Sequence, residues 1–525
     1  MEKESNSIES PASSRASFPS IIQSFEIIGL HGYRDIAINP ANAASILIAN
    51  NGTGKTTLLG ALDAFLKLQF DRLRNLEFSE IRCKLRSYPV PLVLFQTELT
   101  DYLTQEPTER LLRVAAKSSL EPSELQSFVI GEHRINEIVN DDAFYNHSVM
   151  SKLNQAFGYS SRTVSKELDI LKQELLDVSE GIANIALAIR QVLSEYEIVY
   201  LPTYRRIELP LADETRGLQH RRRNMPRFRV AAGSLFTSEI QFGLSDIKDR
   251  LSSINQEVVF ESNNGYRDIS ANIINDLIDG SYAHADQDDT QVPDREELSL
   301  FFSRLREGRK RMGPYLEVDE PDLGKIYTDE SAIPHQSKVF LRYFLGKLKL
   351  IIDRTRDIER PIEDFIQRCN RYLSSSDEFY YRDMTTAAAQ SPIDGKQLKL
   401  DRMTLQVRVE SLPEERKIPL DSLSSGEKQM ISIFSKLFLY PKKKIFLIDE
   451  PELSLSIDWQ RSVLVDIMSA SQCSQLIAIT HSPFVFDNEL DPFAGSLRTR
   501  QTDNLAQFSF DEDLDEFDGD LDFEE

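Results

Sequence analysis

The stretch ILIANNGTGKTTLLGALDAF, residues 46–65, constrains the fold of this chain more than any other feature. The run from Ile46 to Ile48 predicts a buried strand, and apolar residues recur at helical spacing from Leu58 to Phe65. The glycines and the lysine between them therefore fall on a strand-to-helix turn, which is the setting that a phosphate-binding loop requires. The backbone N–H groups of such a loop and the helix N-terminus both favour an anion.

The residues of this turn have separate expected roles. Lys55 would reach the β- and γ-phosphates of a nucleotide, and Thr56 would offer its hydroxyl to Mg²⁺. Ala49 replaces the first glycine of the usual pattern, and alanine resists positive φ. The alternative interpretation is a glycine-rich turn that binds nothing. The expected phosphate-binding residues are Asn51, Gly52, Thr53, Gly54, Lys55, Thr56 and Thr57.

Composition places the chain among ordinary globular proteins. Its 525 residues are 41% hydrophobic and 28% charged, which leaves room for two or more domains. The three cysteines have no metal-ligand spacing, which favours a reducing compartment and argues against a zinc site. Residues 1–20 are polar and predict a disordered leader, not a signal peptide. No apolar run approaches the length of a membrane span, so we expect a cytoplasmic protein without membrane partners.

Charge is unevenly distributed along the chain. The net charge is −23, and residues 501–525 form an acidic tail that we expect to be disordered. A nucleic-acid surface must therefore be local, and the arginine-rich stretch 216–229 is the candidate. The alternative is a solvated loop that pairs with acidic surface. The possible nucleic-acid contacts are Arg221, Arg222, Arg223, Arg227 and Arg229.

The middle of the chain predicts helices between strands. Residues 22–38 and 89–96 have the patterns of strands, and strand-like alternation returns at 398–410. The stretches 166–193 and 339–373 carry apolar residues at helical spacing over several turns. Two such helices suit an antiparallel pair or a helical lid, and two ordinary core helices are the alternative.

A continuous apolar strand near the C-terminus, from Ile445 to Ile448, ends in Asp449 and Glu450. In an open α/β fold this places both carboxylates at the carboxyl edge of the sheet, where ligands bind. Asp449 would hold Mg²⁺, and Glu450 would orient or deprotonate an attacking water. The alternative is a pair of charges at a helix N-terminus.

Two further segments lie close to this strand in the sequence. The stretch QLIAITHSPF (475–484) predicts a second strand, and His481 at its end could contact a γ-phosphate and the water, although a lone histidine is more often structural. Upstream, Ser424, Ser425 and Gly426 open a helix whose N-terminus could bind an anion. An ordinary serine N-cap with a glutamate in the first turn is the alternative there.

The four motifs in this order resemble the ATP-binding-cassette class of ATPases, and more narrowly its soluble RecF/SMC branch. The resemblance implies an α/β fold, an ABC-type ATPase head with a mixed or parallel sheet and a P-loop, split by a large, mainly helical insertion. The implied segments are a leader (1–20), core halves at 21–100 and 396–500, an insertion at 101–395 with a core strand near 197–208, and the tail (501–525).

The resemblance also implies a mechanism and cofactors. Two protomers would pair head to tail around two ATP molecules with Mg²⁺, so that the signature of one faces the P-loop of the other. That signature is Ser424, Ser425, Gly426 and Glu427, and it departs from the usual pattern at Ser425 and Glu427. Ser456 occupies the D-loop position that usually holds aspartate, so slow hydrolysis is expected. Gln96 is the candidate Q-loop residue.

Three stretches narrow the resemblance further: VYLPTYRRIE (199–208), IIGLHGYRDIAI (27–38) and DEPELSLSIDWQ (449–460). They are similar to the PtuA-type ATPases of Septu and retron anti-phage systems. This implies an HNH nuclease partner of the PtuB type, and in retrons a reverse transcriptase with its DNA–RNA product (msDNA). We expect no nuclease site in this chain. The alternatives are a RecF/SMC-like DNA repair ATPase without a toxic partner, and an ATP-gated scaffold with little turnover.

Overall fold

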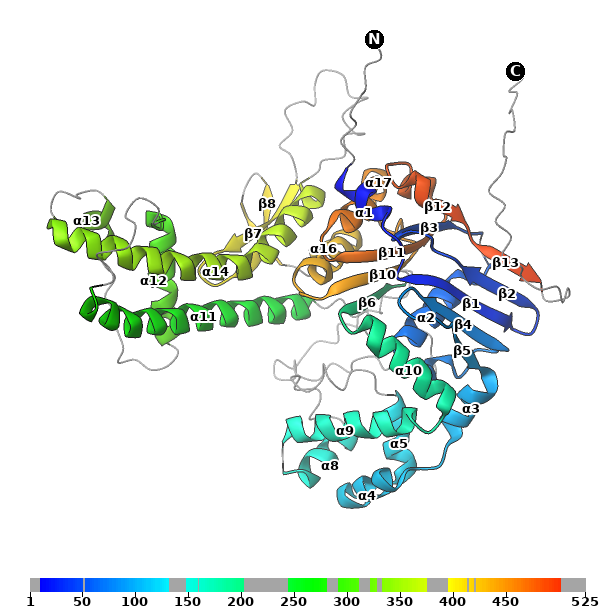
Figure 1. Ribbon diagram of the computed structural model, residues 1–525. Helices are drawn as coiled ribbons and strands as arrows, with labels where there is room; N and C mark the ends of the chain where they lie inside the picture. Colours follow the sequence, from blue (N-terminus) through cyan, green and yellow to red (C-terminus); the bar gives the residue numbers. More distant parts are fainter. Residues whose placement is uncertain are drawn as a thin grey trace, which may run out of the picture. The chain divides into compact units, whose positions relative to one another are not determined.

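The computed structural model describes residues 10–50, 52–131, 148–158, 160–202, 244–280, 291–310, 322–327, 333–374, 395–412, 415–419 and 422–501. Within these ranges the chain is a mixed α/β structure with parallel and antiparallel sheets (Figure 1). The described residues fall into two compact units. The described residues of the first unit lie within 1–21, 40–72 and 188–496, and those of the second lie within 22–39, 73–187 and 497–525.

The first unit contains a parallel sheet with the strand order β12-β3-β11-β10-β6. Strands β10 and β11 are buried along nearly their whole length, as in parallel sheets covered on both faces. Strand β11 lies between β3 and β10, so the carboxyl ends of these three strands adjoin. The predicted strands before the P-loop, Asp449 and His481 are thus confirmed. The strands are β3 (Ala44–Ile48), β6 (Tyr196–Leu201), β10 (Lys443–Asp449), β11 (Cys473–Thr480) and β12 (Ala494–Ser496).

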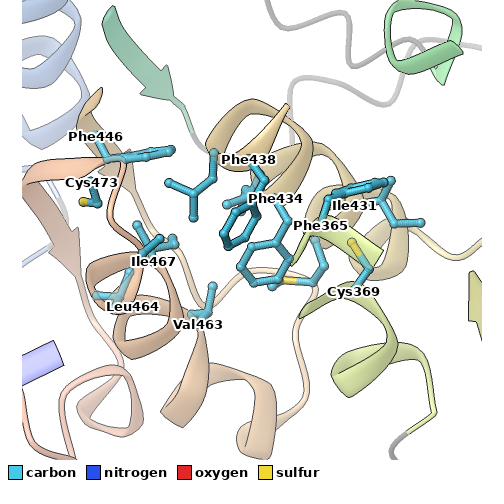
Figure 2. Close-up of a cluster of buried hydrophobic side chains, with 14 of the residues drawn as sticks. Phe365, Cys369, Ile431, Phe434, Phe438, Phe446, Val463, Leu464, Ile467 and Cys473 are labelled. Atoms are coloured by element: carbon cyan, nitrogen blue, oxygen red, sulfur yellow. The ribbon is translucent and has the colours of Figure 1, made fainter. Parts of the chain in front are cut away.

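Helices that pack on this sheet contribute to a cluster of buried hydrophobic side chains. In Figure 2, Phe434 and Phe438 of α16 lie beside Phe446 of β10, and Ile467 of α17 lies below Phe446 in the same cluster. All four side chains are at most 6% exposed. The elements in this part are α2 (Lys55–Leu66), the short helix η1 (Phe70–Leu73), α16 (Ser425–Phe438), α17 (Ile457–Ser469), η7 (Pro483–Val485) and η8 (Asp491–Phe493).

The N-terminal segment is more ordered than the sequence predicts. Residues Pro11–Ala16 form the helix α1, in which Ala12 and Ala16 are buried. The Arg15 guanidinium donates a hydrogen bond to the backbone oxygen of Ala470, at the end of α17. The expectation of a disordered leader over 1–20 is therefore wrong for these residues, because two small apolar side chains one turn apart can pack on the core. Residues 1–9 lie outside the described residues.

Two long helices of the first unit, α11 (Leu244–Ile278) and α14 (His335–Leu373), lie side by side (Figure 1). Tyr343 donates a hydrogen bond to Asp276 at 2.8 Å, and Gly265 faces Ile351, so the two helices run antiparallel. Helix α14 continues through Pro361. The remaining elements here are α12 (Arg295–Lys310), α13 (Leu323–Tyr327), β7 (Gly395–Asp401), β8 (Gln406–Leu412) and β9 (Lys417–Ile418).

This helix pair differs from the predicted one. The stretch 166–193 is not one long helix but two, α9 (Ser161–Leu176) and α10 (Glu180–Leu193). The connection contains aspartate and serine, whose side chains can compete for local backbone hydrogen bonds and which therefore favour helix ends. The partner of α14 is α11, which carries Gly265 within its span. A Cβ at this glycine would lie 2.9 Å from the side chain of Ile351, so glycine permits the close approach of the helices.

The second unit contains an antiparallel sheet with the strand order β13-β2-β1-β4-β5. The predicted strands at 22–38 and 89–96 are confirmed, and Gln96 is the first residue of α3. Among the described residues, no helix is long and apolar enough to cross a membrane. The elements are β1 (Ile22–Leu30), β2 (Arg34–Ile38), β4 (Glu80–Leu85), β5 (Leu92–Phe95), β13 (Arg498–Gln501), α3 (Gln96–Thr104), α4 (Glu109–Ser118), α5 (Pro122–Gly131) and α8 (Ser148–Ala156).

Candidate active site

The turn between β3 and α2 has the backbone that its glycines predict. Gly52 and Gly54 adopt left-handed φ values of +81° and +90°, which side chains other than glycine rarely adopt. Gly54 is the N-cap of α2, and its carbonyl accepts the first helical hydrogen bond from Leu58 at 2.9 Å. Ala49 is not among the described residues with positive φ, so its side chain causes no strain. Asn51 lies outside the described residues.

Three candidate residues, which follow three neighbouring strands of the sheet, meet beside this turn. Lys55, the first residue of α2, places its ammonium 3.4 Å from the Glu450 carboxylate and in hydrogen-bond contact with Nε2 of His481. The same His481 nitrogen lies 3.7 Å from the Glu450 oxygen. Lys55 is only 6% exposed, so its charge lies in a site with little water. The structure thus brings together residues that are far apart in the sequence.

Thr56 and Asp449 form a second contact at the same edge of the sheet. The Thr56 hydroxyl donates a hydrogen bond of 2.6 Å to the Asp449 carboxylate, which is 2% exposed. A hydroxyl and a carboxylate oxygen are the hard ligands that Mg²⁺ prefers, and Mg²⁺ usually takes its other ligands from water and phosphate. The pair therefore fits a nucleotide-bound magnesium ion. Among the described residues, no cluster of three or more histidine, cysteine or acidic side chains could hold a metal alone.

The backbone of Glu450 is unusual. Its φ is +53°, and its N–H donates a hydrogen bond of 2.8 Å to the backbone oxygen of Ile479 on β11. Non-glycine residues in this conformation are uncommon and occur often at functional sites. Asp449 ends a strand, and α17 begins only at Ile457, so these carboxylates are not a charge pair at a helix N-terminus. That alternative is wrong.

The predicted signature opens α16. Ser424 is its N-cap and accepts a hydrogen bond from the Glu427 N–H at 3.3 Å, while Glu427 accepts one from the Ser424 N–H at 2.7 Å. This reciprocal pair is a capping box. The capping interpretation is therefore correct for the free chain, and Ser425 follows as the first helical residue. A role of these residues in trans stays a prediction.

Two contacts fix this first turn of α16. The ammonium of Lys396 on β7 lies 2.9 and 3.0 Å from the two oxygens of the Glu427 carboxylate. A Cβ at Gly426 would come within 2.3 Å of the backbone oxygen of Ser454, in the turn after β10. Only glycine therefore allows α16 to approach the turn that follows Asp449 and Glu450, which we call the acidic pair. Sequence reasoning assigned no role to Lys396, because no motif connects it with the signature.

Other candidate residues occupy less informative positions. Thr53 donates a hydrogen bond to the backbone oxygen of Asn50 at 2.8 Å, and Thr57 lies half-buried in the first turn of α2. Ser456 is the N-cap of α17 but makes no capping hydrogen bond with its side chain. The candidate nucleic-acid contacts at 221–229 and the acidic tail lie outside the described residues.

Sequence reasoning also missed Glu452. This residue belongs to the same Asp-Glu-Pro-Glu run as the acidic pair, and its carboxylate bonds to the backbone of His481. The signal in the sequence that could have identified it is its position two residues after Glu450. The contact depends on the pairing of β10 with β11, which spacing along the chain does not reveal.

A family model described as "AAA domain, putative AbiEii toxin, Type IV TA system" matches residues 337–487. The matched region runs from α14 through the signature helix and the acidic pair to His481, and it does not include the P-loop. A search of the curated proteins finds no match to this chain. The family match supports a P-loop ATPase domain of the AAA type, which implies nucleotide binding and typically Mg²⁺.

Proposed function

We propose that this chain is an ATP-hydrolysing ATPase of the ATP-binding-cassette class. The observation that carries the proposal is the meeting of Lys55, Glu450 and His481 at adjoining strand ends, with Thr56 bonded to Asp449 beside them. A cation, a hydroxyl–carboxylate pair and a carboxylate beside a histidine are together the parts that phosphoryl transfer to water requires. The family match at residues 337–487 supports the same activity.

Each residue has one proposed role. Lys55 binds the β- and γ-phosphates, with the backbone N–H groups of the P-loop around them. Thr56 and Asp449 hold Mg²⁺, which neutralises charge on the phosphates when bound. Glu450 orients the attacking water and accepts its proton, and His481 donates a hydrogen bond toward the γ-phosphate. A phosphate beside Lys55 competes for its ammonium, which frees the Glu450 carboxylate for the water.

The proposed active form is a head-to-tail dimer. The hydroxyls of Ser424 and Ser425 and the backbone N–H groups of Ser425 and Gly426 of one protomer then contact the nucleotide of its partner. The Lys396 ammonium supports this role, because it offsets the negative charge of Glu427 where a phosphate would approach. ATP binding holds the pair together in this proposal, and hydrolysis releases it.

The proposed biological role is control of a partner nuclease in bacterial anti-phage defence. The similarity of three stretches to PtuA-type ATPases supports an HNH nuclease partner, and the proposed further partners are a retron reverse transcriptase and its msDNA. The description of the matching family names a toxin and a type IV TA system. A RecF/SMC-like repair ATPase is the competing proposal.

The ATPase proposal is tested by phosphate release from the purified chain. Glu450→Gln should lower turnover by at least about 10²-fold, because it removes the general base but keeps the shape of the side chain. It should still bind ATP, whereas Lys55→Ala should lose binding. Glu296→Gln, an exposed change on α12, is the matched control. Wild-type turnover that does not respond to Glu450→Gln contradicts the proposal.

The partner proposal is tested by co-purification with the products of the neighbouring genes. An HNH nuclease, with or without msDNA, that elutes with the chain supports the defence role. A chain that elutes alone and binds DNA only with ATP supports the repair role instead. Defence that survives Glu450→Gln but fails with Lys55→Ala indicates an ATP-gated scaffold.

A further inference from the structure

Glu452 uses both of its carboxylate oxygens on one short segment of the neighbouring strand. One oxygen accepts a hydrogen bond of 2.8 Å from the hydroxyl of Thr480, and the other accepts one of 2.9 Å from the N–H of His481. Thr480 is the last residue of β11 and is fully buried. Glu452 thus joins the turn after β10 to the end of β11.

A second bridge runs parallel to the first. The Gln460 side chain on α17 donates hydrogen bonds to the backbone oxygens of Glu452 and Leu455 at 3.3 and 3.0 Å. Its own oxygen accepts a hydrogen bond of 2.8 Å from the Ser482 hydroxyl. The residues on both sides of His481 are therefore tied to the turn that follows the acidic pair.

These bonds determine where the His481 side chain can lie. Its imidazole contacts Lys55 and lies 3.7 Å from Glu450, and Glu450 is itself bonded to Ile479 of β11. The turn after β10 is thus bonded to β11 at both candidate catalytic residues, Glu450 and His481. Because small displacements of a positioned group can cost about 10²-fold in rate, this connection bears on turnover.

We infer that Glu452 is a positioning residue for the hydrolysis proposed above, and the inference rests on that proposed function. Glu452 does not touch the nucleotide in this inference. It holds the peptide of His481 so that the imidazole faces Lys55 and Glu450.

Glu452 acts through hydrogen-bond geometry and not through its charge. A glutamine at this position can still accept from the His481 N–H through its oxygen. Its amide N–H₂ can donate to the Thr480 hydroxyl, because a hydroxyl accepts as well as donates. Alanine can make neither bond. Glu452→Gln therefore removes the charge but keeps both hydrogen bonds, whereas Glu452→Ala removes the charge and both bonds. Comparing the two variants shows whether the hydrogen bonds matter.

The test compares steady-state ATP hydrolysis by the wild-type chain, Glu452→Ala, Glu452→Gln and Glu450→Gln. We expect Glu452→Ala to lower kcat by about 10–10²-fold with little change in KM, because phosphate binding by Lys55 remains. Glu452→Gln should stay within about 3-fold of wild type. A kcat of Glu452→Ala equal to wild type overturns the inference, and so does a Glu452→Gln variant as impaired as Glu452→Ala.

A second measurement does not depend on turnover. The ring resonances of the seven histidines can be followed by NMR, with His481→Gln identifying the relevant signal. Glu452→Ala should shift or broaden that signal, and Glu452→Gln should leave it near its wild-type position. An unshifted signal in Glu452→Ala overturns the inference. A wild-type chain without ATPase activity refutes the proposed function, whereas the NMR result still decides whether Glu452 holds His481.

Discussion

Asp466 on α17 binds three side chains at the C-terminal end of α14, and its replacement should destabilise the first unit of the chain. Its carboxylate is 2% exposed and accepts hydrogen bonds from Arg368 and Arg371, both at 2.8 Å, and from the Tyr372 hydroxyl at 2.7 Å. Burial, with the Asp466 charge, raises the pKa of Tyr372. The hydroxyl therefore remains a hydrogen-bond donor at neutral pH.

The expected cost follows from the exposure of the three donors. Asp466→Ala deprives the buried Tyr372 hydroxyl of this acceptor, which costs about 1–3 kcal/mol. The side chains of Arg368 and Arg371 are 35% and 57% exposed, so water replaces much of each lost interaction. Each arginine pair then contributes only about 0.2–1 kcal/mol. We therefore expect Asp466→Ala to lower the free energy of unfolding by about 3 kcal/mol.

The single tryptophan of the chain provides a local probe of this junction. The ring of Trp459 lies 5.5 Å from that of Tyr372, so its fluorescence reports unfolding at the contact between α14 and α17. With a slope of about 3 kcal/mol per M urea, the midpoint should fall by about 1 M. Asp487→Ala removes an exposed pair with Arg461 and should shift the midpoint far less.

A double-mutant cycle makes the reasoning refutable. Tyr372→Phe alone should cost about 1–1.5 kcal/mol. The double variant with Asp466→Ala should cost at least about 1 kcal/mol less than the sum, because no hydroxyl remains to lose its acceptor. A midpoint for Asp466→Ala within about 0.2 M of wild type refutes the anchoring role. Additive effects refute the assigned contribution of the tyrosine.

Other predictions concern the rest of the first unit. The side chains of Glu359 and Arg304 are 7% and 5% exposed and form an ion pair. Glu359→Gln breaks this pair and should lower the free energy of unfolding, measured in urea, by about 3–5 kcal/mol. The double variant Arg304→Met with Glu359→Leu should lower it little. Gly426→Ala should impair both stability and ATP hydrolysis, because its Cβ meets a backbone oxygen, whereas Gly495→Ala, with open space, should do neither. Burial lowers the pKa of Lys444 below its usual value of 10.5, so just below pH 10.5 the unfolded chain binds more protons than the folded chain. The free energy of unfolding should therefore rise with pH in this range, as measured by urea unfolding. The Lys444→Met variant should not show this rise.

Short-range patterns were enough to predict that the candidate site residues lie together, whereas their roles stay predictions. The P-loop was visible because its glycines, its lysine and the flanking apolar runs all fall within residues 46–65. Asp449 and His481 were visible because each follows an apolar strand. Parallel strands end at a common edge, so their proximity could be inferred without knowing the strand order.

The parts that sequence missed depend on tertiary packing. The span of α11 contains serine, asparagine and Gly265, which have low helix propensity, and its stability comes from α14 at its side. The contacts of Glu452 with Thr480 and of Lys396 with Glu427 join different elements. Their spacing in the chain carries no recognisable pattern, so only the folded structure reveals them.

The strand order explains why the P-loop cannot form a complete site by itself. Strand β3 pairs only with β11 and β12 among the described strands, and both come from the last quarter of the described sequence. The strand that presents His481 therefore separates the P-loop strand from the strand that presents Glu450. Lys55 can contact both residues only when β3, β11 and β10 lie side by side in this order. The contacts of Lys55 with Glu450 and His481 therefore form only when the long chain between the P-loop and the signature has brought β3 beside β11.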